Sequence, residues 1–294
     1  MFGYTFAKSY ARGYLIFKRL THRNLPGLGR ALDLIKTERV LIVKGLKFHF
    51  DPLVGRAYGL MIIGQRNEPE THSFLVSVMI QIGEKVNFVD VGASIGEFAV
   101  DMAANEKVST VIAFEPQPEA ARAVEKSFAI NGFQKARVIQ KIVTDGQKDL
   151  YFLHDLQSPT ASHVVSSISK DLKGNQRLMK IPATNLDEEL SEIEGSTIIL
   201  LDIEGGEYLA MKGCLSFIRR WRPLLIFEYN SISRKSFDLN MVRNLLGPDY
   251  SIYRLRADGL VDINETNTWN MVAVSKSSNF FKIVFSLLYD ASRD

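Results

Sequence analysis

Short apolar runs alternate with amphipathic stretches through most of the chain, which predicts buried strands alternating with helices. The runs that predict parallel strands are 88–91, 111–114, 136–143, 197–201 and 223–227. The stretches that predict helices are 71–82, 95–103, 118–131, 208–218 and 237–246. Two later runs, 250–255 and 271–274, predict a closing antiparallel hairpin. The pattern therefore favours an α/β fold with a mostly parallel, seven-stranded sheet and helices on both faces.

The two ends of the chain have a different pattern. Residues 2–20 predict a helix with an aromatic stripe and, on the other side, Lys8, Arg12 and Arg19. The stripe consists of Phe2, Phe6, Tyr10, Tyr14, Phe17 and Leu20. Such a helix either lies on an anionic membrane surface or packs its aromatics on the rest of the chain or on another subunit. We expect an N-terminal extension over 1–50, a main domain over 51–278 and an apolar tail over 279–294.

Composition and charge narrow the class of protein. An apolar content of 46% and a charged fraction of 23% are ordinary for a soluble globular protein. The single cysteine, Cys214, excludes an internal disulfide, and no apolar run approaches the ~20 residues that span a bilayer. We therefore expect a cytoplasmic protein, with peripheral contact at the inner membrane face as a further option. Residues 1–47 hold ten Lys/Arg against two acids, a net charge of +8, whereas the remainder is net −5, which argues against a nucleic-acid partner.

A strand, a glycine turn, a helix, a second strand and an acid follow one another between Asn87 and Pro116. This is the layout of a nucleotide-binding βαβ unit, in which glycine lets the backbone approach a ligand and the acid accepts hydrogen bonds from ribose hydroxyls. The glycines, Gly92 and Gly96, have G-x-x-x-G spacing instead of the dinucleotide G-x-G-x-x-G. Asp90, two residues before the first glycine, suits the cationic amino-acid end of S-adenosylmethionine (SAM). Glu115 is the expected ribose ligand.

Other candidate binding positions surround this unit. They are Ala93 and Ser94 in the glycine turn, Pro116 after the second strand, Val143 and Asp145 after the third, and Glu68 in the polar turn before the 71–82 helix. Positions after the third strand of such a unit commonly line an adenine pocket. Glu68 is as consistent with a solvated turn as with a binding site. The polar, serine-rich stretch 155–180 is expected to be a long substrate loop or lid.

A second group of acids follows the 197–201 strand in the segment Asp202-Ile203-Glu204-Gly205-Gly206-Glu207, and Glu228 ends the next strand. Chemistry in open α/β sheets is placed at the carboxyl ends of the strands. Asp202, Glu204 and Glu228 are therefore candidate catalytic residues, and Asp202 is also a candidate cofactor contact. They could act as a general base or hold a divalent cation, and the spacing does not decide between the two. Helix capping explains Glu207 better than it explains Asp202.

The motifs FVDVGASIGEF, VIAFEPQPEA, NEPETHSF and LLDIEGGEYLAMKGC followed by PLLIFEYN resemble the FkbM family of SAM-dependent methyltransferases over about residues 60–230. The resemblance implies a class I methyltransferase (Rossmann-like) fold. It implies that Asp90, Gly92 and Gly96 cradle the methionine end of SAM, that Glu115 holds the ribose, and that Asp202 and Glu204 lie near the transferred methyl. The family usually has a lysine where this chain has Leu201.

Together these patterns predict a SAM-dependent O-methyltransferase that acts on a hydroxyl of a saccharide, a glycolipid or a natural product. The expected partners are a small-molecule or lipid-linked glycan acceptor and no nucleic acid, with an anionic membrane and a second copy of the chain as further options. A degenerate methyltransferase fold that serves as a membrane-associated scaffold is the alternative, and Leu201 is the feature in its favour. No metal ligands are assigned.

Overall fold

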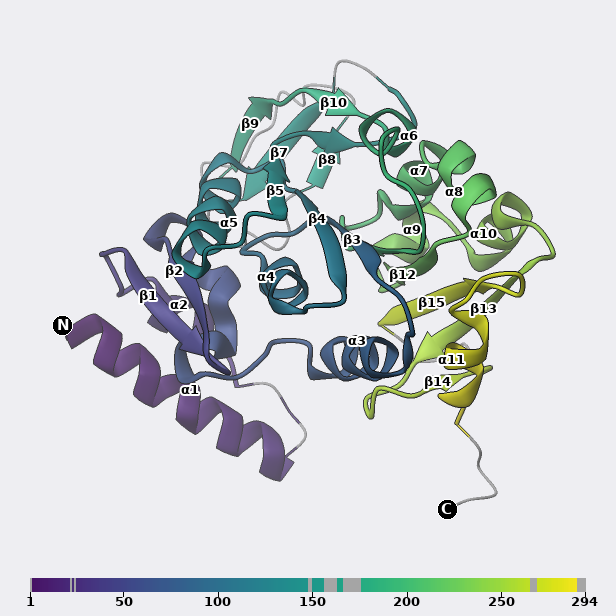
Figure 1. The fold of residues 1–294 in the computed structure, drawn as a ribbon. Coiled ribbons are helices and arrows are strands. Elements are labelled where there is room, and N and C mark those ends of the chain that lie inside the picture. Colours follow the sequence, from purple (N-terminus) through teal and green to yellow (C-terminus); the bar gives the residue numbers. More distant parts are fainter. Residues whose placement is uncertain are drawn as a thin grey trace.

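A mixed sheet of eight strands forms the centre of the molecule (Figure 1). The computed structural model describes residues 2–21, 23, 25–147, 150–155, 163–165, 176–264 and 269–289. In spatial order the strands are β14 (Val261–Asp262), β13 (Tyr250–Leu255), β15 (Asn270–Ser275), β12 (Leu224–Glu228), β11 (Thr197–Leu201), β3 (Val86–Val91), β4 (Val108–Phe114) and β5 (Ala136–Ile139). The last five are parallel, and β15 is antiparallel to both of its neighbours. This is the predicted mostly parallel sheet with its closing hairpin, extended by the short edge strand β14.

The chain order reverses at the middle of this sheet. From β3 the chain passes to β4 and β5 on one side, and it returns through β11 and β12 on the other. In open α/β sheets, ligands bind outside the carboxyl ends of the strands at such a reversal. A ligand site is therefore expected at the carboxyl ends of β3, β4 and β11.

Helices cover both faces of the sheet, and each face has its own apolar core. Phe88 and Val89 illustrate the alternation, because they belong to opposite cores although they are neighbours in β3. One face is covered by α3 (Pro69–Gln81), α4 (Glu97–Ala104), α5 (Pro118–Asn131) and α11 (Phe281–Ser286). The other is covered by α6 (Leu186–Glu189), α7 (Glu207–Lys212), α8 (Leu215–Trp221), α9 (Ser233–Ser236) and α10 (Leu239–Leu246). The strands are buried on both sides, which explains their continuous apolar character.

Two predicted elements are divided in the structure. The 208–218 helix is broken into α7 and α8 at Gly213, where a Cβ atom would lie 2.1 Å from the Thr144 carbonyl oxygen. The third strand leaves the main sheet after Ile139 and continues as β6 (Ile142–Val143), which pairs with β10 (Ala183–Thr184). Before the main sheet, β1 (Arg39–Val43) and β2 (Leu46–Phe50) form a hairpin around a two-residue turn. The hairpin is followed by a 3-10 helical segment, η1 (Pro52–Ile63).

The sequence predicted one long loop over 155–180, but parts of this stretch form strands. A separate three-stranded antiparallel sheet combines β7 (Tyr151–Asp155), β8 (His163–Val165) and β9 (Gln176–Lys180). Residues 156–162 and 166–175 of the predicted loop lie outside the described residues.

The N-terminal extension packs beside the main sheet. It begins with the long helix α1 (Phe2–Thr21), as predicted, and continues through α2 (Leu28–Leu32) to the β1–β2 hairpin. The hairpin is tied to α5, since Ser127 accepts a hydrogen bond from the His49 N–H (2.9 Å) and Asn131 accepts one from the Lys47 N–H (3.1 Å). Within the described residues, no helix combines the length and the apolarity that crossing a membrane requires.

Candidate functional site

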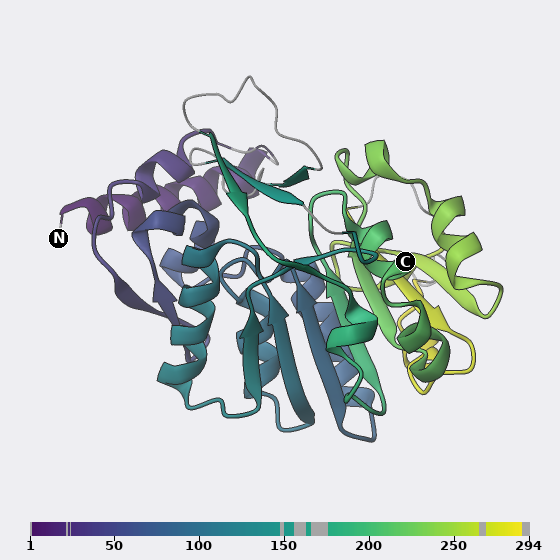
Figure 2. The same ribbon diagram turned by 90° about the horizontal axis from the view of Figure 1, so that it is seen from above.

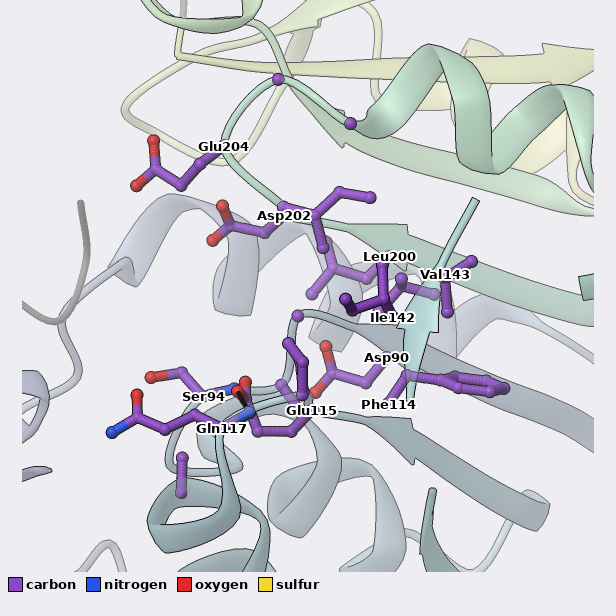
Figure 3. Close-up of a pocket in the computed structure, with 18 of the residues that line it drawn as sticks. Asp90, Ser94, Phe114, Glu115, Gln117, Ile142, Val143, Leu200, Asp202 and Glu204 are labelled. Atoms are coloured by element: carbon purple, nitrogen blue, oxygen red, sulfur yellow. Dashed lines mark hydrogen bonds between the residues drawn. The ribbon is translucent and has the colours of Figure 1, made fainter. Parts of the chain in front are cut away.

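A cavity of about 1100 Å³ opens at the carboxyl ends of β3, β4 and β11, where the chain order reverses (Figure 3). Typical small-molecule pockets occupy roughly 300–1000 Å³, so this cavity has room for a cofactor and a second molecule. Most of the predicted site residues line it, namely Glu68, Asp90, Gly92, Ala93, Ser94, Glu115, Pro116, Val143, Asp202 and Glu204. Gly96, Asp145 and Glu228 do not line it.

The turn after β3 is pressed against the end of β11. Gly92 has a φ of +88°, and a Cβ atom there would lie 1.9 Å from the Asp202 carbonyl oxygen. Asp202 in turn donates its N–H to the Val91 carbonyl at 2.9 Å. Only glycine fits such a turn, because it combines a left-handed backbone with a close backbone approach. Gly96, with a φ of +79°, is the N-cap residue of α4 behind the turn, and it does not line the cavity.

Glu115 joins the end of β4 to the glycine turn. Its carboxylate accepts hydrogen bonds from the backbone N–H groups of Ser94 (2.7 Å) and Gln117 (2.8 Å). Burial raises the pKa of Glu115 to about 7, although both hydrogen bonds act in the opposite direction. Each carboxylate oxygen can accept more than one hydrogen bond, so Glu115 can still receive a diol that enters the cavity.

Asp90 and Glu68 form the acidic floor and side wall of the cavity. Asp90 accepts a hydrogen bond from the Ala99 N–H (3.1 Å), and burial raises its pKa to about 7. Glu68, half-buried at the start of α3, also has a pKa raised by burial to about 7, and it accepts hydrogen bonds from Asn270 (3.0 Å) and Thr71 (3.3 Å). The structure therefore removes the ambiguity about Glu68, which lines the cavity and is not a solvated turn residue.

The acids after β11 and β12 crowd together on the opposite wall. Figure 3 shows the carboxyl groups of Asp202 and Glu204 projecting to the same side. Burial, followed by the negative charge of Glu228, raises the pKa of Asp202 well above its ordinary value. Burial and neighbouring acids also raise the pKa of Glu228 to about 8, and its Oε2 atom has no hydrogen-bond partner among the described residues. Glu228 thus lies behind the cavity wall and acts on Asp202 through its charge.

Glu207 has a different task in the same segment. Its carboxylate accepts hydrogen bonds from the N–H groups of Ile203 (3.0 Å) and Gly205 (3.1 Å), which holds the β11–α7 turn in shape. Glu207 is also the acid in the first turn of α7, where negative charge stabilises the helix, as its position suggested. Within the described part of the chain, no three histidine, cysteine or acidic side chains are arranged as ligands of one metal ion.

The wall next to β4 and β6 is mainly apolar. Its members are Phe114, Ile142, Val143, Leu150 and Phe152. Val143 therefore lies where an adenine pocket was expected. Asp145 does not, because it points to Lys212 and forms an ion pair with it at 2.7 Å.

A buried ionic network beside the cavity was not foreseen from the sequence. Glu97 accepts hydrogen bonds from the backbone N–H (2.8 Å) and the side-chain amide (2.7 Å) of Asn67, and both residues line the cavity. His72 lies between Glu97 (3.2 Å) and Asp101 (3.0 Å). Burial lowers the pKa of His72, but the hydrogen bonds to both acids outweigh it and raise that pKa. The one available signal was that Glu97 and Asp101 are four residues apart and share a helical face.

Comparison with known proteins adds to this geometry. The family described as "Methyltransferase FkbM domain" matches residues 90–254. Comparison with the curated proteins gave no match. Among solved structures, a methyltransferase FkbM from Methylobacillus flagellatus KT is similar at 18% identity, with a TM-score of 0.46. The match covers 76% of this chain and 53% of that one, so this chain spans about half the length of that methyltransferase. TYW2 of M. jannaschii, solved in complex with AdoMet, is similar at 12% identity, with a TM-score of 0.43, over 87% of this chain and 90% of that one.

Proposed function

The chain belongs to the FkbM methyltransferase family, and from this premise we propose that it transfers the methyl group of SAM to a hydroxyl of a saccharide, a glycolipid or a natural product. SAM is the cofactor of the family. The observation that carries the hydroxyl assignment is the group of acids at the ends of β11 and β12, of which Asp202 and Glu204 line the cavity.

The cavity fits the chemistry of SAM. Buried carboxyl groups with pKa values near 7 are more stable as anions when a cation lies beside them, and SAM carries an ammonium and a sulfonium. Asp90 and Glu68 would therefore hold the cationic amino-acid end, and Gly92 would let the backbone approach it. Glu115 would accept hydrogen bonds from the ribose hydroxyls. The apolar wall that includes Val143 and Phe152 would pack on the adenine.

Asp202 is suited to receive a proton from the acceptor. When bound, SAM supplies an electrophilic methyl group. A general base works best when its pKa lies near the working pH, and burial together with Glu228 raises the pKa of Asp202 towards that range. Asp202 would hydrogen-bond the acceptor hydroxyl, orient its oxygen and take its proton, while Glu204 on the same wall accepts a hydrogen bond from a neighbouring hydroxyl.

The acidic wall also favours a hydroxyl acceptor over an amine. An amine beside Asp202 and Glu204 would be held as an ammonium ion, because an adjacent negative charge stabilises the protonated form. Such an ion has no lone pair for attack. A hydroxyl stays neutral and can donate its proton to a carboxylate. The space beyond the cofactor position, within a cavity of about 1100 Å³, would accommodate a sugar-sized acceptor.

The scaffold alternative depended on Leu201. In the structure, Leu201 is buried in the core beneath α7 and α8, and it is the preceding residue, Leu200, that lines the cavity. No observation on the described residues now favours the scaffold. Binding of S-adenosylhomocysteine separates the two hypotheses, since a folded chain that fails to bind it in calorimetry is not a methyltransferase.

The test of the hydroxyl assignment is the Asp202→Asn variant. Asparagine keeps the shape of the side chain but cannot take a proton, so turnover of labelled SAM with glycolipid extracts should fall about 10²–10⁴-fold. Binding of S-adenosylhomocysteine should change little. Asp145→Asn, outside the cavity, is the matched control and should retain activity. Full activity of Asp202→Asn would exclude Asp202 as the base.

A further inference from the structure

Helix α1 presents an apolar face to solvent. Phe2, Phe6, Ile16 and Leu20 are 83%, 44%, 59% and 78% exposed, although they share one side of the helix. The opposite side rests on the protein through the small, fully buried residues Ala7 and Ala11. Tyr4 and Tyr10 pack partly buried against the core. The four exposed side chains do not pack on the rest of the chain, although one of the sequence-based interpretations placed the aromatic stripe there.

The exposed face is long and ordered. Phe2 and Leu20 are separated by eighteen positions, which is five full turns and about 27 Å of helix. The ring of Phe6 stacks on that of Phe2 at 6.4 Å and lies 6.3 Å from that of Tyr10. The Tyr10 hydroxyl donates a hydrogen bond to the Pro26 carbonyl, which ties the helix to the segment that follows it. The helix is thus held against the protein with its apolar side outward.

Positive charge flanks this face. Arg12, Lys18 and Arg19 are exposed, and none of them forms an ion pair with another described residue. There is no acid at all in residues 1–32, which contain six Lys/Arg residues. An apolar stripe bordered by unpaired basic residues is the pattern of a helix that lies in the plane of an anionic membrane surface. A basic surface is complementary to anionic lipid, and these three side chains are not engaged by any described acid of the main domain.

We propose that α1 docks the protein on an anionic phospholipid bilayer, with Phe2, Phe6, Ile16 and Leu20 inserted at the level of the headgroups and Arg12 and Arg19 against the lipid phosphates. The inserted depth for helices of this kind is roughly 5–10 Å, which side chains of this size reach. The inference concerns a surface outside the cavity and goes beyond the methyl transfer itself.

The docked bilayer would lie next to the cavity. α1 packs against η1, and η1 supplies Val54, Arg56, Ala57 and Gly59 to the cavity lining. Figure 2 shows α1, in purple near the N label, on the same side of the molecule as the upper ends of the central strands. A lipid-linked acceptor held in the bilayer would therefore reach the cavity from the side that η1 lines, whereas an acceptor free in water gains nothing from α1.

Vesicle binding of the full chain tests the proposal. The probes are phosphatidylcholine vesicles with and without roughly one third phosphatidylglycerol, a content that gives a strongly negative surface. We expect the protein to sediment with the anionic vesicles and not with the neutral ones, and its binding to weaken as the salt concentration is raised. Arg12→Gln with Arg19→Gln should weaken binding roughly thirty-fold. The matched charge control is Arg219→Gln with Arg220→Gln on α8, which lies far from α1 in Figure 1 and should bind as the parent chain does.

The apolar contribution has its own variant. Phe2→Ser with Leu20→Ser should weaken binding at least about ten-fold, because two large side chains no longer leave water. Ile263→Ser, which changes a side chain that is 73% exposed near β14, is the matched control and should have no effect. All four substituted residues on α1 are exposed, so the variants should fold, and unchanged binding of S-adenosylhomocysteine verifies that they do.

Three results would overturn the proposal. One is a folded parent chain that does not bind anionic vesicles, and another is equal binding by the α1 variants and the parent. The third is a concentration-dependent dimer, without vesicles, that Phe2→Ser with Leu20→Ser dissolves, since a second copy would then cover the face. A chain that binds vesicles but not S-adenosylhomocysteine would contradict the methyltransferase function and leave the docking surface intact.

Discussion

Replacing Gly92 with alanine tests how the cavity is built. The substitution places a Cβ atom 1.9 Å from the Asp202 carbonyl oxygen. Real Cβ atoms essentially never come within 3.0 Å of a heavy atom outside their own residue and its chain neighbours. The end of β11 must therefore move by at least about 1 Å, or the glycine turn must open. Either movement displaces Asp202 and Ser94 relative to each other, so the variant should damage both stability and ligand binding.

The expected cost has two parts. A non-glycine residue at a φ of +88° costs about 1–2 kcal/mol, and overpacking a well-filled site costs about 1–3 kcal/mol. We therefore expect the free energy of unfolding to fall by about 2–5 kcal/mol. Gly132→Ala is the matched control, because Gly132 has a φ of +73° but a Cβ atom there would meet no other atom within 4 Å. It should lose only the conformational part, about 1–2 kcal/mol.

The assay is urea denaturation of both variants together with calorimetry of S-adenosylhomocysteine binding. The difference between the two variants isolates the close approach to Asp202, since both replace a glycine of positive φ by alanine. Gly92→Ala should also lose measurable binding at ligand concentrations that saturate Gly132→Ala. Equal destabilisation of the two, with binding retained in both, would refute the argument that the turn must be pressed against β11.

Three further predictions concern the acids and their neighbours. Glu228, like Glu115, has a raised pKa in the folded chain, so the folded state binds more protons than the unfolded state. The free energy of unfolding of the ligand-free protein should therefore fall as pH rises from about 5 to 8. Glu228→Gln should flatten that fall in unfolding experiments at several pH values, and an unchanged slope would contradict the assignment. Glu115→Gln should weaken S-adenosylhomocysteine binding about ten-fold by calorimetry, because an amide is a poorer hydrogen-bond acceptor than a carboxylate. Unchanged affinity would show that Glu115 does not contact the ribose. Asn67→Ala should lower the free energy of unfolding by about 2–3 kcal/mol, since it leaves the Leu60 N–H without its partner and removes the side-chain amide that hydrogen-bonds to Glu97. A loss below about 0.5 kcal/mol would show that the network is not strongly coupled.

The strands of the fold were predictable because their signal is local. Each core strand is a continuous apolar run, and the runs reappear as β3, β4, β11, β12 and the closing hairpin. The break at Gly213 was not predictable, since its cause is the Thr144 carbonyl, which is distant in sequence. The turn of the β1–β2 hairpin was also missed, because it uses Lys44 and Gly45, both with positive φ, instead of the common Asn-Gly pair.

The candidate site was predictable where a motif carries its own geometry. Asp90, Gly92 and Glu115 follow from one βαβ unit, and the structure brings all three to the cavity. Glu68 could not be distinguished from a surface acid, because its burial depends on Asn270. The position of His72 between two acids likewise depends on α3 packing against α4, which no local pattern reveals.

The link between Glu68 and Asn270 has a consequence for how the protein is made. The side-chain amide of Asn270 donates hydrogen bonds to both Glu68 (3.0 Å) and Thr71 (2.9 Å). An acid near the start of the domain is therefore positioned by β15, the second strand of the closing hairpin. A ribosome must therefore release nearly the whole chain before this wall of the cavity exists. In nascent chains that stop short of β15, Glu68 would lack its hydrogen bond from Asn270. The ability to bind a nucleoside would therefore arise late in synthesis, once the closing hairpin has folded.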